Sequence, residues 1–150
     1  MPYVEPITPN ATHVLFGDSW FDANSETNQP EIENHLKTRL PDATIINAGV
    51  GGNTVCDLLA RFDTDVVPLN PDYVWINSSI NDYYNDVSRV DFKLRMQYLI
   101  SKVQSINATA LVMDSAPASG TSQAGSDLRV LSNGYAGAVL ELLEAASATE

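Results

Sequence analysis

Gly17-Asp18-Ser19 follows a short apolar run, residues 13–16, that predicts a β-strand. Ser19 would then lie at the carboxyl end of a strand, where open α/β proteins place reactive groups. A serine hydroxyl in such a place is a candidate nucleophile, but it needs a base to take its proton. The chain holds two histidines, His13 and His35. His13 is expected at the opposite end of the same strand and His35 inside a helix, so we expect neither to be that base.

Two further loops carry groups that could stabilise an oxyanion. Gly52 lies in a loop after a second predicted strand, and glycine lets a substrate approach the backbone closely. Asn81 follows a third predicted strand and supplies a neutral amide donor. Acyl transfer requires a nucleophile together with donors aimed at the oxyanion that forms when it attacks a carbonyl. We therefore expect Ser19, Gly52 and Asn81 to converge on one edge of a sheet.

The elements that would position these groups alternate between strands and helices. Apolar runs predict strands at residues 13–16, 43–46, 73–76 and 110–113. Helical spacing of apolar residues predicts helices at about 30–40, 54–62 and 91–106, and a last one at 128–145 after a loop at 115–126. Strands joined by crossover helices form a parallel sheet covered on both faces. The sequence thus predicts an α/β fold, a three-layer α/β/α sandwich with a parallel sheet.

The second of these helices carries two more detailed expectations. Asn53 is expected to cap it, with Val55, Leu58, Leu59 and Phe62 on its inward face. Cys56, the single cysteine, is expected in the core on the apolar side of the helix. One cysteine excludes an internal disulfide and a multi-cysteine metal site, and we expect neither a metal nor a cofactor.

Length and composition favour one globular domain, residues 1–150, in which residues 1–12 form an N-terminal extension. The net charge of −11 makes nucleic acid and anionic membranes unlikely partners, because such a surface repels phosphate. The apolar runs are too short to span a bilayer, and the first ten residues lack the pattern of a signal peptide. We expect a soluble protein, located in the cytoplasm or in a viral particle.

Three motif blocks resemble those of the SGNH hydrolases, also called GDSL esterases and lipases. The blocks are Gly17-Asp18-Ser19 with Trp20, then Gly51-Gly52-Asn53-Thr54, then Asn81-Asp82, in the family's order. The resemblance implies a flavodoxin-like fold with Ser19 as nucleophile. It also implies that the N–H groups of Ser19 and Gly52 and the Asn81 amide form the oxyanion hole. Asp18, Asn53 and Tyr83, next to these groups, are expected to contact substrate, and Ser79 occupies the place of a usual glycine in the third block.

The family's fourth block, Asp-x-x-His, supplies the base and its orienting acid. One alignment places it at Asp127-Leu128-Arg129-Val130, which puts valine where the histidine belongs and implies an inactive relative. A second interpretation takes residues 128–145 as the helix that precedes the family's last strand, and places the base beyond Glu150, in residues that were lost by truncation, lie outside this sequence or were never present.

These readings leave two hypotheses open. The first is a serine esterase that acts on small acyl esters, for example acetyl groups on carbohydrate, through an acyl-enzyme. The second is an inactive SGNH-like structural or glycan-binding module, such as a surface subunit of a virion, within a homo-oligomer or larger assembly. A flavodoxin-like nucleotide binder is disfavoured, because no loop resembles a phosphate cradle.

Overall fold

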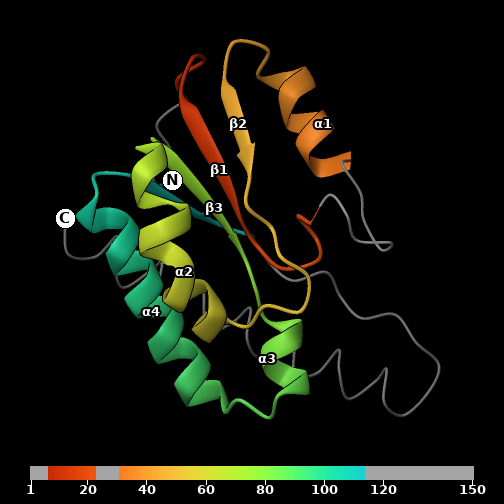
Figure 1. Ribbon diagram of the computed structural model, residues 1–150, viewed down its shortest axis with the longest axis vertical. Coiled ribbons are helices and arrows are strands. Elements are labelled where there is room, and N and C mark those ends of the chain that lie inside the picture. Colours follow the sequence, from red (N-terminus) through yellow and green to blue (C-terminus); the bar gives the residue numbers. More distant parts are fainter. Residues whose placement is uncertain (1–6, 23–30, 114–150) are drawn as a thin grey trace, which may run out of the picture.

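Four parallel strands form one sheet in the order β2-β1-β3-β4 (Figure 1). The computed structural model describes residues 7–22 and 31–113. The strands are β1 (Thr12–Gly17), β2 (Thr44–Asn47), β3 (Tyr73–Asn77) and β4 (Thr109–Val112). Each expected strand is confirmed to within one residue at either end.

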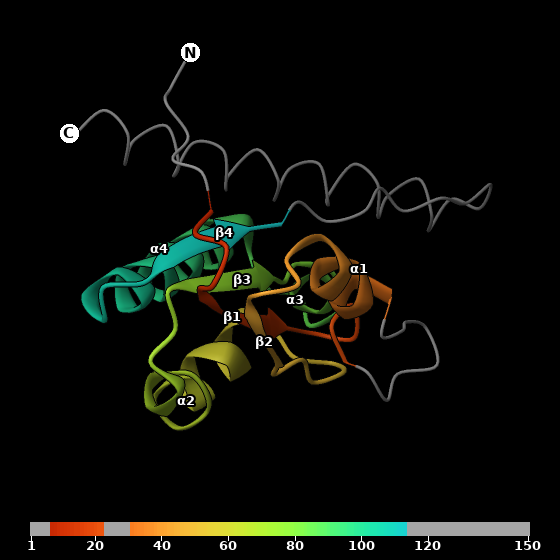
Figure 2. The ribbon, with the colours of Figure 1, turned by 90° about the horizontal axis from the view of Figure 1, so that it is seen from above.

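Helices cover both faces of this sheet. They are α1 (Glu31–Arg39), α2 (Val55–Asp65), the 3₁₀ turn η1 (Val67–Leu69), α3 (Ile80–Tyr84) and α4 (Arg89–Ser105). Figure 2 shows α1 on one side of the sheet and α2 and α4 on the other. This arrangement confirms the three-layer α/β/α sandwich. The loop expected at 115–126 and the helix expected at 128–145 lie outside the described residues.

The strand order explains which face each helix covers. The chain moves from β1 to β2 in one direction along the sheet and then from β2 past β1 to β3 in the other. Right-handed crossovers place helices on opposite faces when this direction reverses. The step from β3 to β4 keeps the second direction, so α4 joins α2 on the same face.

The main core lies between the sheet and the pair α2 and α4. Alternate residues of the central strands point into it, namely Val14, Phe16, Val74 and Ile76. They meet helix side chains spaced three or four residues apart, including Leu58, Phe62, Phe92, Met96, Leu99 and Val103, all buried. On the opposite face of the sheet Asn47 donates a hydrogen bond to Glu33 of α1 at 2.8 Å.

Two expectations about α2 are wrong. Thr54, not Asn53, caps the helix: its hydroxyl accepts from the Asp57 N–H, and the Asp57 carboxylate accepts from the Thr54 N–H. Cys56 is exposed rather than in the core. The inward stripe runs through Val55 and Leu58, and one residue along a helix turns about 100° away from such a stripe.

The two helices between β3 and β4 differ from expectation. The short helix α3 was not predicted, because five residues are too few to show a helical period. The helix α4 begins two residues before the expected Asp91, since the Ser88 hydroxyl accepts from the Asp91 N–H and caps it. In the described part of the chain, no helix combines the length and apolar character needed to cross a membrane.

Substitution of Phe62 tests the core between α2 and the sheet. Its ring is 1% exposed and meets the Phe16 ring edge-on at 6.0 Å between centroids. We expect Phe62→Ala to lower the free energy of unfolding by about 3 to 5 kcal/mol, because it removes buried surface and leaves a cavity. Urea unfolding followed by circular dichroism measures the change.

Leu94→Ala is the matched control, since Leu94 is 59% exposed on α4. We expect it to change the free energy of unfolding by less than about 0.5 kcal/mol. Equal losses in the two variants would contradict the assignment of the core to this face of the sheet.

Candidate active site

The loops after β1, β2 and β3 leave the sheet at the same edge. The register places Gly17 beside Asn77, so β1 and β3 end together, and Asn47 beside Leu15, so β2 ends two residues earlier at the same edge. Figure 1 shows α3 and the loop after β2 close to this edge. Parallel strands present their carboxyl ends together, and ligands of open α/β sheets bind there.

Ser19 lies in a tight turn directly after β1 and is half-buried. The N–H groups of Phe21 and Asp22 both donate to the Asp18 carbonyl at 3.1 Å, which closes the turn. Phe21 is buried beneath it, whereas 41% of Trp20 is exposed. A Cβ on Gly49 would lie 2.5 Å from the Asp22 nitrogen, so the second loop needs glycine there to pack against the Ser19 turn.

The loop that holds Gly52 reaches the Ser19 turn. The Gly51 N–H donates to the Asp22 carboxylate at 2.9 Å, and a Cβ built on Gly51 would lie 3.9 Å from the Ser19 Cβ. Gly52 itself is exposed and has a φ of +81°, a conformation that favours glycine. The open space beside it leaves room for a ligand to approach its backbone.

Asn81 connects this loop to the first one. It lies in the first turn of α3, and its Nδ2 donates to the Asn53 carbonyl at 3.0 Å and toward Asp18 Oδ2 at 3.5 Å. The structure therefore brings Ser19, the Gly52 loop and Asn81 to one place. Their roles as nucleophile and oxyanion donors remain predictions.

The three expected substrate contacts lie in different surroundings. Asp18 has no exposed surface, and its Oδ1 accepts from the Trp20 N–H at 3.0 Å. The Asn53 side chain accepts a hydrogen bond from Arg61 at 2.7 Å. Tyr83 is not brought to Ser19 by any of these contacts; it packs partly against the core, with its ring 5.5 Å from that of Tyr84. Contact of these residues with substrate remains a prediction.

A second buried carboxylate, Asp82, holds the third loop to the second. Its two oxygens accept the Val55 N–H at 3.2 Å, and Oδ2 also accepts the Ser78 hydroxyl at 2.9 Å. The sequence places Asp82 in the third motif block but predicts no role for it. Ser79, at the usual glycine position, has an extended φ of 162°, which any residue can adopt.

Both carboxyl groups are harder to ionise than an exposed aspartate. Burial raises the pKa of Asp18 to about 6. The hydrogen bond from the Trp20 N–H lowers this pKa, and the nearby charge of Asp82 raises it further. Burial also raises the pKa of Asp82, although its bonds from Ser78 and Val55 oppose this. Perturbed carboxyl groups of this kind are typical of functional sites.

The histidines lie where the sequence predicted. His13 is fully buried in β1, its Nδ1 accepts the Trp75 indole N–H at 3.0 Å, and its ring stacks on Tyr73 at 4.8 Å. Burial lowers its pKa, against the opposing charge of Asp72. His35 is exposed on α1. Within residues 7–22 and 31–113, no group of three or more His, Cys, Asp or Glu side chains could hold a metal ion.

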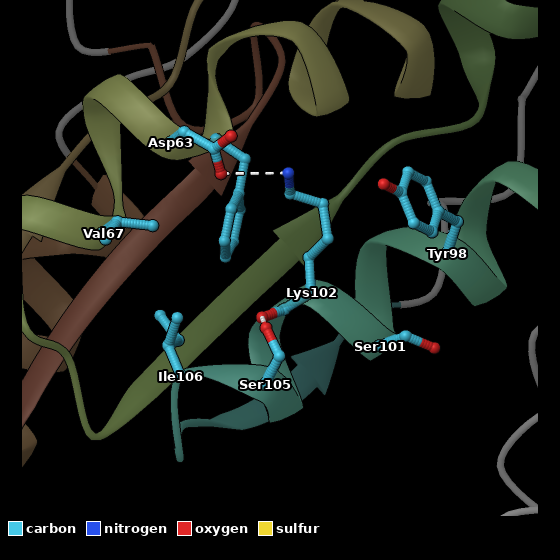
Figure 3. A pocket seen from close by; sticks show the side chains of 8 residues that line it. Asp63, Val67, Tyr98, Ser101, Lys102, Ser105 and Ile106 are labelled. Carbon is cyan, nitrogen blue, oxygen red and sulfur yellow. Dashed lines mark hydrogen bonds and ion pairs between the residues drawn. The ribbon is translucent and has the colours of Figure 1, made fainter.

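A groove of about 410 Å³ lies between α2 with η1 and α4, and contains none of the predicted site residues. Figure 3 shows Lys102 reaching across it to the Asp63 carboxylate, at a distance of 2.9 Å. The Lys102 ammonium also lies 5.4 Å from the centre of the Phe62 ring. Its charge is thus engaged within the protein, and the carboxyl edge of the sheet remains the candidate site.

The raised pKa of Asp18 predicts a pH dependence of stability. An unfolded aspartate titrates near pH 4, so the folded chain binds a proton here more tightly than the unfolded chain does. The stabilising effect is complete below about pH 4 and is lost as pH rises through about 6. Relative to Asp18→Asn, the wild type should therefore lose about 2 to 3 kcal/mol between pH 4 and pH 7.

Urea unfolding of both proteins across this pH range measures the difference. Asp82 titrates in both proteins, so most of its own contribution cancels. Parallel curves for the two proteins would contradict a buried, ionisable carboxyl at position 18.

Solved structures of hydrolases share this fold. A catalytic mutant of Axe2, an acetylxylan esterase from Geobacillus stearothermophilus, superimposes with a TM-score of 0.79 and 20% identity over 94% of this chain and 75% of its own. LAE5, an alpha/beta hydrolase enzyme from the metagenome of Lake Arreo in Spain, gives a TM-score of 0.74 at 22% identity, over 89% of this chain and 72% of its own. At these identities the likeness establishes the fold.

A protein similar in sequence matches a shorter stretch of this chain, but with a higher identity than the solved structures. An acetylxylan esterase of Geobacillus stearothermophilus is 40% identical over 55 residues, which is 37% of this chain. The match spans 25% of that relative's own length.

A family model covers nearly the whole chain. The model of the GDSL-like Lipase/Acylhydrolase family matches residues 15–149, a range that begins just before Gly17-Asp18-Ser19 and includes all three motif blocks. With the fold of the SGNH hydrolases and their motif residues gathered at one edge of the sheet, the chain belongs to the GDSL-like lipase/acylhydrolase family.

Proposed function

We propose that the chain forms the acyl-binding part of a serine esterase that removes acetyl groups from carbohydrate. The Ser19 oxygen attacks the ester carbonyl carbon, and its proton passes to a general base. The carbonyl oxygen becomes an oxyanion held by the N–H groups of Ser19 and Gly52 and the Asn81 amide. The C–O bond to the sugar then breaks, the sugar oxygen takes the proton, and water releases acetate from Ser19.

The observation that carries this proposal is the meeting of the three motif loops. Asn81 bonds to Asn53 and lies beside Asp18, while Gly51 bonds to Asp22 and approaches Ser19. The bond to Asn53 fixes the Asn81 amide in place. Its second N–H lies 3.5 Å from Asp18 Oδ2 and would turn from that oxygen to the oxyanion. An acetyl ester on a carbohydrate is supported by the relatives, because both the similar sequence and the similar structure are acetylxylan esterases.

The base must come from elsewhere than the described histidines, because His13 is engaged with Trp75 and His35 lies on α1. Catalytic mutants of Axe2 replace a serine, an aspartate or a histidine, and the last two lie three positions apart in that protein. We propose that an Asp-x-x-His segment outside this sequence, or from another subunit, supplies an imidazole next to Ser19.

Ser19→Ala tests the nucleophile. With p-nitrophenyl acetate we expect the wild type to form an acetylated protein, detected as a mass increase of one acetyl group that maps to Ser19. Added imidazole should raise the wild-type rate more than the Ser19→Ala rate, because it can act as the absent base. Release of acetate from acetylated xylooligosaccharides extends the test to the proposed substrate.

Ser101→Ala is the matched control, since Ser101 is exposed on α4, away from the site. It should behave as the wild type does. Equal rates for wild type and Ser19→Ala, with and without imidazole, would overturn the esterase proposal and favour an inactive glycan-binding module.

Asn81→Ala tests the oxyanion hole. With imidazole added as the base, we expect kcat to fall by about 10²- to 10³-fold with little change in KM, because the amide acts mainly on the charge that develops after attack. The exposed amide variant Gln97→Ala on α4 serves as control. An Asn81→Ala enzyme with unchanged kcat would contradict the role of this side chain.

A further inference from the structure

Arg61 is placed between two of the motif loops, although no motif contains it. It lies in the middle of α2, and its side chain is 16% exposed. The guanidinium carbon lies 4.4 Å from the centre of the Phe16 ring, a cation–π contact. A charged group held in this way needs partners for its N–H groups.

Its three nitrogens donate in three directions. Nε donates to Asn53 Oδ1 at 2.7 Å, and one terminal nitrogen donates to the Gly17 carbonyl at 3.1 Å. The other terminal nitrogen donates to Asp65 at 3.0 Å, within the same helix. Arg61 therefore bonds to the residue directly after Gly52 and to a residue two positions before Ser19.

The Gly17 carbonyl also connects the end of β1 to the loop after β2. It also accepts the Val50 N–H at 3.0 Å, so the end of β1 and the second loop share one acceptor. Arg61 adds a second donor to this oxygen and joins it to Asn53 through a rigid, planar group. A lysine has one nitrogen on a flexible chain and cannot donate along these fixed directions.

We propose that Arg61 is a positioning residue for the oxyanion hole: it sets the Gly52 N–H relative to Ser19 by holding Gly17 and Asn53 at a fixed separation. The inference deepens the proposed function and rests on it for its effect on turnover. Arg61 acts through the two loops and does not touch the reacting atoms. Small displacements of catalytic groups cost up to about 100-fold in rate.

Turnover of p-nitrophenyl acetate by Arg61→Lys and Arg61→Ala, with imidazole added as the base, tests the inference. We expect kcat to fall by about 10- to 100-fold in both, with KM changed by less than about threefold. Methylguanidinium should restore part of the lost kcat in Arg61→Ala and none in Arg61→Lys, whose side chain fills the site. Arg39→Lys, an exposed change on α1, should leave kcat and the methylguanidinium response as in the wild type.

A purely structural role predicts a different result. In that case the variants would lose stability in urea, and methylguanidinium would restore no turnover, which would overturn the inference. Unchanged kcat in Arg61→Lys would overturn it as well.

A second measurement separates this inference from the proposed function. In ¹H–¹⁵N spectra, the Gly52 amide resonance should shift in Arg61→Lys and in Asn53→Ala but not in Arg39→Lys. Shifted resonances in a protein without Ser19-dependent turnover would support the positioning by Arg61 and contradict the esterase proposal. An unshifted Gly52 resonance in Arg61→Lys would overturn the positioning, whatever the turnover.

Discussion

A buried carboxylate needs hydrogen-bond donors around it, and Asp82 accepts hydrogen bonds from its own loop and from the start of α2. The Ser78 hydroxyl belongs to its own loop, while the Val55 N–H belongs to the first turn of α2. The first N–H groups of a helix have no partner inside the helix, and they favour a negative charge. The Asp82 carboxylate thus supplies an acceptor for an N–H group at the start of α2, and this N–H group supplies a donor for the carboxylate. The bond connects the third loop to the second.

Asp18 extends this arrangement to the first loop and adds an electrostatic cost. It faces Asn81, which also bonds to Asn53, so the three loops form one connected network. The charges of Asp18 and Asp82 repel each other in surroundings from which water is excluded, and burial raises both pKa values. Sites that hold groups in unfavourable surroundings often trade stability for function. Here the hydrogen bonds that the two carboxyl groups accept hold the loops together despite this cost.

The fold could be predicted from the sequence because its signals are local and repeated. Alternation along β1 and β3 selects Val14, Phe16, Val74 and Ile76, and helical spacing selects Leu58 and Phe62 opposite them. Cys56 was misplaced because one step along a helix is enough to leave the buried stripe. The cap at Thr54 was missed because Asn53 next to it is an equally good capping residue, and only the bond to Asp57 distinguishes them.

The contacts that build the site could not be predicted in the same way. The motif blocks identified Ser19, Gly52 and Asn81, but the pairs that connect them are distant in sequence and follow no period. Asp22 with Gly51 and Arg61 with Gly17 are such pairs. A polar side chain in a loop has many partners within reach, and the backbone path decides which of them it meets. From the sequence, Arg61 in particular is expected to be an ordinary helix residue that pairs with Asp65 four positions later, and this pair is indeed present.

The hydrogen bonds that join the three loops also matter for the question of which segment supplies the donors and which supplies the base. Bonds among the described residues already join the three loops to one another. A base requires one correct distance to Ser19, whereas an oxyanion hole requires several donors to agree in position. Under the proposed function, the part with the stricter geometry is therefore the part that these bonds and the two buried carboxyl groups hold at the edge of the sheet. The base would then need only to reach Ser19.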